Sequence, residues 1–444
     1  MSNNKLLFSS IRNFINPNYK CEKIGKIKYA TFINPFQPIS QIMLAVPLGS
    51  ANDSINGLAN LTMHMLISST KKMNTEKLYK ELELKGIKLN SFAFWDDSAI
   101  IIMCLSEHID FASQILLDCL CEPCFNDDDL TRLKRKTIAE LELRKSEPDF
   151  LSHRAFSENY FFGTEYAHYK SGDIEHINNI TIDDCINFYN MIKKTDILLI
   201  AGGDIDSHII KKNIVDKINI MLLDENINRE TPQVIDNLPK NQGIYIIDRD
   251  ETDQTSLTFG IPTLLKTDED FPELQLINTI YGGYFGSKLN SIIRENLGLT
   301  YGIHSYIDAR QRASVLKITS DLKTEGLLTA ITTIFEEFNK LKTFQISKEE
   351  IEVTQNYIYG SFLRSMDTPF QIAELLRNLL INDLETDYFD KYLEKIKNVT
   401  PEILLDKAQK YLDFSKYSIG LAGNYDLIEA TLGNNFDINR FVLS

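Results

Sequence analysis

An internal repeat is the feature that most constrains the fold of this 444-residue sequence. Thr181 opens a helical pattern that leads to an apolar strand ending at Gly203, and Thr400 opens a similar pattern that leads to a strand near Gly423. A third pair of segments, Glu147-Pro148-Asp149-Phe150 and Thr368-Pro369-Phe370, has nearly the same offset. Three matches at one spacing of about 220 residues indicate two copies of one fold.

The duplication predicts an α+β chain of two homologous halves, each a mixed β-sheet covered by helices. The polar segment 223–242 contains two prolines and lacks periodicity, so we expect domains at residues 1–222 and 243–444 with a linker at 223–242. In the first half, the patterns predict strands at Gln41–Leu48 and Ser98–Cys104. They predict helices at Ile55–Ser69, Thr75–Leu84, Asp110–Leu120 and Asp127–Lys145. In the second half, Gly243–Arg249 and Gln254–Ile261 are expected to begin a second sheet.

The composition excludes several classes of protein. With 43% hydrophobic residues the chain is globular rather than disordered, and its formal net charge of −15 argues against nucleic acid or an anionic membrane as the main partner. No apolar run has the length of a signal peptide or a membrane span, so we expect a cytoplasmic location. Among six cysteines, Cys119, Cys121 and Cys124 lie close together. Because no second CxxC or nearby histidine completes a site, this run indicates the end of an apolar helix before Pro123 rather than a metal or redox centre.

The expected helix at 55–69 carries the first candidate site. Asn60 and His64 are four residues apart and therefore share a face, with Met63 expected beside them. Helix-borne zinc peptidases use two histidines at this spacing, with a glutamate between them as the general base. Asparagine is a poor zinc ligand and a thioether cannot accept a proton, so these residues alone favour an ordinary helix histidine.

Three segments carry a family resemblance: GLANLTMHMLISST from Gly57, GIKLNSFAFWDDSA at 86–99 and TRLKRKTIAELELRKSEPDF at 131–150. They resemble the insulinase/pitrilysin-type zinc metallopeptidases, which include the mitochondrial processing peptidase. The resemblance implies an inverted motif, His-x-x-Glu-His, with a further glutamate some 76 residues later, which is Glu140 here. It also implies that each half forms part of a clamshell, and that an edge strand with Asn90, Ser91, Phe92 and Ala93 receives a substrate peptide.

Mapped onto this sequence, the zinc motif is incomplete. The first ligand position is Asn60, the base position is Met63, the second ligand is His64 and the third is Glu140. Two of three ligands remain and the base is absent, so we expect no metal in this chain and no hydrolysis by the chain alone.

A second signature of the family is intact. The segment from Tyr281 to Tyr301 resembles a Gly-rich turn, a helix ending in Arg-Glu, and Gly-Leu-x-Tyr entering a strand. The resemblance assigns Arg294 and Tyr301 to a pair that binds the substrate backbone and stabilises the tetrahedral intermediate across the chamber from zinc.

The combination predicts a non-catalytic, substrate-binding subunit of a heterodimeric peptidase, whose homologous partner carries His-x-x-Glu-His and the zinc. The predicted partners are that subunit and a peptide, with no nucleic acid and no membrane. The alternatives are a scaffold subunit derived from a peptidase, a weak metalloenzyme that uses Asn60, His64 and Glu140, and a stand-alone peptide-binding protein.

Overall fold

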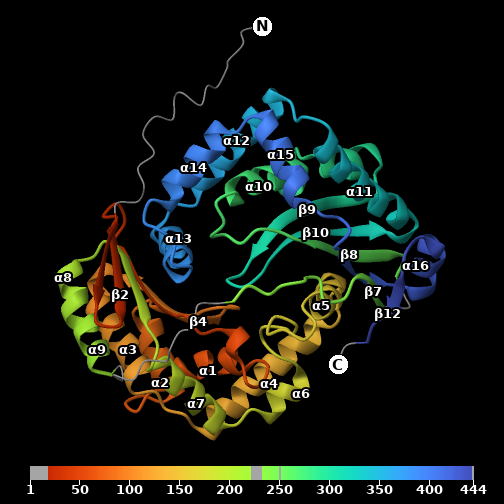
Figure 1. The fold of residues 1–444 in the computed structure, drawn as a ribbon. Helices are drawn as coiled ribbons and strands as arrows, with labels where there is room; N and C mark the ends of the chain where they lie inside the picture. The colour runs from red at the N-terminus through yellow and green to blue at the C-terminus, as the bar shows by residue number, and fades with distance from the viewer. Residues whose placement is uncertain (1–18, 222–232, 250–251, 443–444) are drawn as a thin grey trace.

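Two mixed sheets carry the fold of the computed structural model, which describes residues 19–221, 233–249 and 252–442 (Figure 1). In these ranges each sheet has six strands. The first sheet has the spatial order β1 (Tyr19–Ile24), β2 (Ile27–Ile33), β6 (Ile197–Gly203), β3 (Ile39–Val46), β5 (Ser98–Leu105) and β4 (Lys88–Ala93). The second has the order β12 (Ile438–Arg440), β7 (Gly243–Asp248), β11 (Ser418–Gly423), β8 (Gln254–Pro262), β10 (Ser314–Lys323) and β9 (Thr300–Ala309).

Five strands of each sheet follow the same pattern, which confirms the predicted duplicated α+β fold. β2 and β6 are parallel, as are β7 and β11, whereas the strands from there to the edge are antiparallel in both sheets. The sixth strands differ in origin. β1 forms an antiparallel hairpin with β2, whereas β12 comes from the end of the chain and pairs in parallel with β7.

Helices cover the sheets in both halves. Those of the first half are α1 (Leu58–Leu66), α2 (Thr75–Leu84), α3 (Ile109–Cys121), α4 (Asp127–Arg144), α5 (Pro148–Tyr160), α6 (Ile174–Asn179), α7 (Ile182–Ile192), α8 (Ser207–Ile210) and α9 (Asp216–Met221). Those of the second half are α10 (Phe271–Asn278), α11 (Leu327–Thr343), α12 (Lys348–Arg364), α13 (Pro369–Ile381), α14 (Tyr388–Asn398), α15 (Pro401–Tyr411) and α16 (Tyr425–Leu432). No helix of the described ranges has the length and apolar character needed to cross a lipid bilayer.

The repeated sequence segments mark equivalent helix starts. The hydroxyls of Thr181 and Thr400 accept hydrogen bonds from backbone N–H groups in the first turns of α7 and α15. Pro148 and Pro369 occupy the first positions of α5 and α13. A backbone N–H at this position would have no acceptor within the helix, so its absence in proline costs no hydrogen bond. The strands that follow α7 and α15, β6 and β11, are buried along their whole length.

The two halves exchange these proline-initiated helices. α5 comes from the first half but packs on β11, β8 and β7 of the second sheet, and α13 packs on β6 and β3 of the first. Figure 1 shows α13 (blue) reaching the N-terminal sheet and α5 (yellow) lying beside β7 and β8. Each sheet is therefore covered on one face by a helix from the other half, an exchange that the predicted ranges 1–222 and 243–444 do not describe.

The expected linker is described only from residue 233, because 223–232 lie outside the described residues. The described part is packed rather than extended. Leu238 is 7% exposed in an apolar cluster with Phe156, Phe161 and Val315, and the Lys240 amide donates to the Tyr160 carbonyl oxygen at 2.9 Å.

The close contact of α5 with β11 gives a prediction at Gly420. A Cβ there would lie 2.2 Å from the Ser152 carbonyl oxygen and 2.4 Å from the Phe156 nitrogen, which are backbone atoms that cannot rotate away. Gly420→Ala is expected to lower the free energy of unfolding by about 1–3 kcal/mol, measured by urea denaturation. Gly360→Ala in α12 is the control, because the nearest atom there is 3.8 Å away, and it should be neutral or stabilising. Equal stability of the two variants would contradict the packing argument.

Candidate functional site

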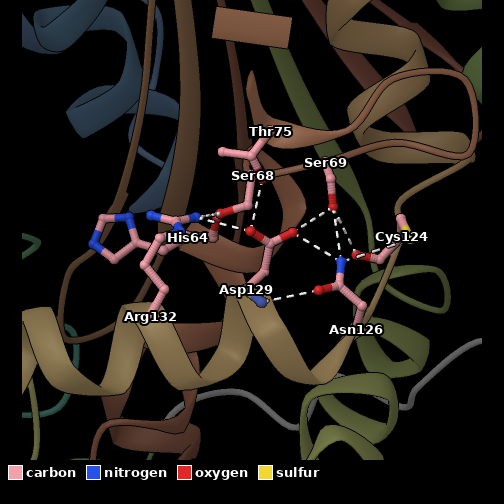
Figure 2. A network of polar contacts seen from close by, with 8 residues as sticks. All are labelled: His64, Ser68, Ser69, Thr75, Cys124, Asn126, Asp129 and Arg132. Carbon is pink, nitrogen blue, oxygen red and sulfur yellow. Dashed lines mark hydrogen bonds and ion pairs between the residues drawn. The ribbon is translucent and has the colours of Figure 1, made fainter. Parts of the chain in front are cut away.

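A network of polar contacts fixes α1 against α4 (Figure 2). The Asp129 carboxylate accepts hydrogen bonds from the hydroxyls of Ser69 and Thr75, both at 2.7 Å, and from Asn126 at 2.8 Å. These bonds hold the pKa of Asp129 at about 2, against the opposing effect of burial. Arg132 pairs with Asp129 and also donates to the Ser68 hydroxyl at 3.1 Å. The first turns of α4 are therefore joined to the end of α1.

This junction sets the register of two antiparallel helices. Ser68, just beyond α1, contacts Arg132 near the start of α4. One helical turn further, Lys136 is close enough to lower the pKa of His64. Asn60 and His64 lie on α1 and Glu140 lies on α4, and the two helices pack against each other. The three positions that the resemblance assigns to zinc ligands, Asn60, His64 and Glu140, thus belong to one pair of helices.

His64 is held as a neutral imidazole. Its Nδ1 lies 2.9 Å from the Ser91 hydroxyl of β4, and burial, followed by the charge of Lys136, lowers the pKa of His64 to about 4. Ser91 was predicted only as part of a peptide-binding strand. Lys136 was not predicted, although its position four residues before Glu140 on a helix would have indicated a contact with that residue.

The remaining motif positions do not form a zinc site. The Glu140 side chain is 60% exposed and lies 3.8 Å from the Lys136 ammonium, whose positive charge opposes a metal cation nearby. In the described residues no group of three or more His, Cys, Asp or Glu side chains could hold a metal ion. One imidazole, one carboxylate and a neighbouring ammonium therefore do not fit the three-ligand site of a catalytic zinc.

Met63 differs from the sequence expectation. It was expected on the face of Asn60 and His64, but it is 1% exposed and packs in the apolar core of the first half, whereas those two side chains are partly exposed. α1 also begins later than expected, at Leu58 instead of Ile55. The Asp53 carboxylate accepts hydrogen bonds from the amides of Gly57 and Ala59, at 2.8 and 2.7 Å, and Gly57 has a φ of 95°. Together these set the start of the helix.

The four predicted substrate-strand residues lie on β4, the outer strand of the first sheet. β4 pairs only with β5 in the described residues, with Asn90 opposite Ile101 and Phe92 opposite Ala99. Asn90 and Phe92 point to the exposed face, while Ser91 is buried towards α1 and Ala93 is half-buried. The outer backbone N–H and C=O groups of such a strand have no partner strand.

Arg294 and Tyr301 lie on the second half, on either side of the turn that enters β9. Arg294 belongs to a π-helical segment (Asn290–Asn296), and its guanidinium stacks 4.1 Å over the Phe285 ring, a contact that the sequence did not predict. Its Nη1 is buried and has no hydrogen-bond partner in the described residues. The Tyr301 side chain is 98% exposed. Tyr301 is thus open to solvent, and Arg294 has a buried N–H donor group that has no partner in the described residues.

A polar cavity of about 420 Å³ adjoins Tyr301. It lies between α5 and the second sheet, and it is lined by Tyr301, Gly302 and His304 of β9, by Thr319 and Asp321 of β10, and by His153 of α5, among others. Burial, followed by the charge of Lys317, lowers the pKa of His153 to about 4, with Asp149 and Asp308 opposing the shift.

The pKa of His153 predicts acid sensitivity. A histidine whose pKa is lower in the folded chain than its unfolded value of about 6.5 stabilises the fold above that pH. This contribution, up to about 3 kcal/mol, is lost as the pH falls from about 6.5 to 4. His153→Gln should flatten the pH dependence of the unfolding free energy in that window, as measured by urea denaturation. The exposed His208 is the control, and His208→Gln should keep the slope; an unchanged slope in His153→Gln would contradict the prediction.

The cysteine run ends a helix, as predicted. α3 finishes at Cys121, and Cys119, Cys121 and Cys124 are free thiols. Burial raises the pKa of the Cys119 thiol to about 12 and that of Cys121 to about 11, so both are protonated and unreactive near neutral pH.

Comparison with known proteins agrees with this arrangement. Residues 28–167 match the family model described as Insulinase (Peptidase family M16), and residues 179–358 match the model described as Peptidase M16 inactive domain. The chain is 27% identical to the "Probable inactive metalloprotease YmfF" of Bacillus subtilis (strain 168) over 266 residues, which are 58% of this chain and 60% of that relative. It is 26% identical over 388 residues to the "Non-peptidase homolog YmxG" of Helicobacter pylori (strain ATCC 700392 / 26695), covering 85% of this chain and 84% of that relative.

Solved structures share the fold. The structure described as the peptidase M16 inactive domain from Pseudomonas fluorescens superposes with a TM-score of 0.83 at 21% identity, and covers 92% of this chain and 98% of that chain. The two family models together span most of residues 28–358, and the duplicated sheets agree with both. The chain therefore belongs to the insulinase family of peptidases, family M16.

Proposed function

We propose that this chain is the non-catalytic, substrate-binding subunit of a two-chain zinc peptidase. Its partner would be a homologous chain with His-x-x-Glu-His intact, which supplies the zinc and the general base. This chain would supply Arg294 and Tyr301, whose N–H and O–H donors bind the substrate carbonyl oxygen as it gains negative charge.

The observation that carries the proposal is the contrast between the two signature regions. On α1 and α4 the candidate motif positions lack the groups for zinc catalysis, since Met63 lies in the core and Glu140 lies beside Lys136. Near β9, by contrast, Tyr301 is almost fully exposed to solvent, and the Arg294 Nη1 has no hydrogen-bond partner in the described residues. An exposed tyrosine and an arginine with an unpaired donor, in a chain whose α1 lacks the residues of a zinc motif, favour a role on a substrate that is held at the metal of another chain.

The edge strand β4 suits the same role. An extended peptide that adds to the outer side of β4 would satisfy its free backbone groups, and the exposed Asn90 and Phe92 would contact alternate side chains. Peptide binding would thus use main-chain hydrogen bonds that many sequences can make, in keeping with processing or degradation of peptides.

Reconstitution tests the proposal. This chain and a homologous chain with His-x-x-Glu-His, encoded in the same genome, are purified separately and mixed with a quenched fluorescent peptide. We expect cleavage only by the mixture, and stoichiometric zinc only in the second chain. Chelator-sensitive cleavage by this chain alone would overturn the proposal in favour of a self-sufficient enzyme. Full activity of the second chain alone would instead favour a scaffold or a separate peptide-binding role.

A further inference from the structure

A second cavity lies where four helices of the second half meet the far end of β9. Its volume is about 350 Å³, and its walls come from α10, α12, α13, α14 and β9. Most of the lining is apolar, with Phe271 of α10, Ile307 of β9, Leu375 of α13 and Phe389 of α14 among the side chains. This size and character are typical of a site for a small ligand or for one residue of a larger one.

One cation, Lys266, lines this cavity, and no carboxylate does. In the part of the chain that the structure describes, the Lys266 ammonium makes no hydrogen bond or ion pair; only its backbone oxygen is engaged, by the Tyr388 hydroxyl at 3.3 Å. Burial, followed by the nearby charge of Arg377, lowers the pKa of Lys266 to about 8, so the side chain is still mostly charged at neutral pH. Lys266 is only partly exposed, and an ammonium in such a place without a counter-ion is less well solvated than in water, so an anionic ligand would stabilise it.

Arg377 does not compete for such an anion. It already pairs with Asp97 and, at 2.9 Å, with Glu374. Lys266 is therefore the cation that remains for a ligand in this cavity.

Three amide side chains complete the polar part of the lining. Asn378 and Asn382 each use one N–H on a backbone oxygen of α13, at 3.0 and 2.7 Å, which leaves their second N–H and their carbonyl oxygen available. Gln275 of α10 also lines the cavity. Amides of this kind suit a ligand that has peptide groups next to its charge, which a simple fatty acid lacks.

We propose that this cavity binds the terminal carboxylate and the apolar last side chain of a peptide, with Lys266 as the counter-ion. The inference rests on the proposed peptide-binding function and specifies its substrate as a peptide with a free carboxyl end. β9 connects the two places, because it carries Tyr301 near its start and Ile307 at the cavity. At about 3.3 Å per residue, roughly six extended residues span the distance along the strand.

A neighbouring cavity provides the contrast. It is larger, about 790 Å³, and shares Tyr388 and Tyr392 with the first, but Asp268, Glu269, Glu273 and Glu394 are among its lining. That excess of carboxylates would repel a peptide carboxylate, so the two cavities should discriminate by charge.

Calorimetric titration of the full chain, without a partner, tests the proposal. The probes are an N-acetylated heptapeptide ending in leucine, as the free acid and as the carboxamide. We expect the acid to bind at least about 10-fold more tightly, a difference of about 1.4 kcal/mol. In Lys266→Met the two forms should bind within about two-fold of each other. Lys395→Met, which removes a lysine of the neighbouring cavity, is the matched control and should keep the preference.

Equal binding of acid and amide to the unaltered chain would overturn the inference without need of any variant. A fatty acid is the other source of an apolar carboxylate, and octanoate is the probe for it. Tight octanoate binding that the peptide acid does not displace would overturn the assignment to a peptide. The result is separable from the proposed function, because Tyr301→Phe should keep the preference for the acid. Absence of cleavage by the mixture of the two unaltered chains, with that preference intact, would count against the proposed function alone.

Discussion

Tyr301→Phe in this chain is expected to lower kcat of the reconstituted two-chain peptidase by about 100-fold or more, with little change in KM. Removal of a single donor to a developing oxyanion has an effect of this size in other hydrolases. The Tyr301 hydroxyl has no structural duty that its loss would disturb, since its side chain is 98% exposed. Arg294→Ala should have a comparable effect, and Arg294→Lys should recover only part of the rate, because an ammonium lacks the planar fork of donors.

Tyr306→Phe is the matched control for this experiment. Tyr306 lies on the same strand, β9, and is 39% exposed, but it is not part of the family signature. Its variant should retain turnover within about two-fold of the unaltered chain, whereas the loss in Tyr301→Phe amounts to about 2.7 kcal/mol of transition-state stabilisation. Unchanged kcat in both Tyr301→Phe and Arg294→Ala would remove the pair from the mechanism and favour a scaffold subunit.

The largest expected effect on stability concerns the ion pair between Asp97 and Arg377. Asp97 lies in the turn between β4 and β5, and Arg377 lies on the exchanged helix α13. Their side chains are 7% and 8% exposed, and the guanidinium also stacks 4.1 Å over the Phe94 ring. Arg377→Met leaves the buried Asp97 carboxylate without its partner, and Asp97→Asn leaves the buried guanidinium with only the exposed Glu374. Each change should lower the free energy of unfolding, by about 3–5 kcal/mol for Arg377→Met and by less for Asp97→Asn.

A double-mutant cycle separates the pair from the lost packing. The double variant Asp97→Asn/Arg377→Met buries no unpaired charge, so it should be more stable than the sum of the single effects predicts. The exposed pair of Lys391 and Glu385, with side chains 57% and 75% exposed, is the control, and its removal should change stability by less than about 1 kcal/mol. Additive effects at Asp97 and Arg377 would show that the pair is not coupled.

The sequence predicted the duplicated fold and most of its elements because those depend on local patterns. Thr181 and Thr400 cap equivalent helices, and the apolar runs that follow become the buried strands β6 and β11. The position of β4 at a sheet edge also followed from the resemblance. The orientation of Met63 did not, because residues three and four apart share a helix face only approximately, and the core packed against α1 decides which of them it buries.

Contacts between distant segments had no signal in the sequence. The cavity around Lys266 and the pairing of Asp97 with Arg377 join elements from separate parts of the chain. So does the exchange of α5 and α13, although the prolines that start both helices were visible as part of the repeat.

By itself the sequence indicated two things: that one fold occurs twice, and that Asn60 and Met63 stand at the positions that the family resemblance assigns to a zinc-binding histidine and a catalytic glutamate. Helix caps, apolar patterns and the chemistry of single side chains are local properties, so the sequence alone is enough to indicate both. Only the tertiary structure decided which half supplies the helix that covers each sheet, which side chains stay exposed, and where a cation in a cavity lacks a counter-ion. These properties depend on packing between residues hundreds of positions apart, and no local pattern encodes them.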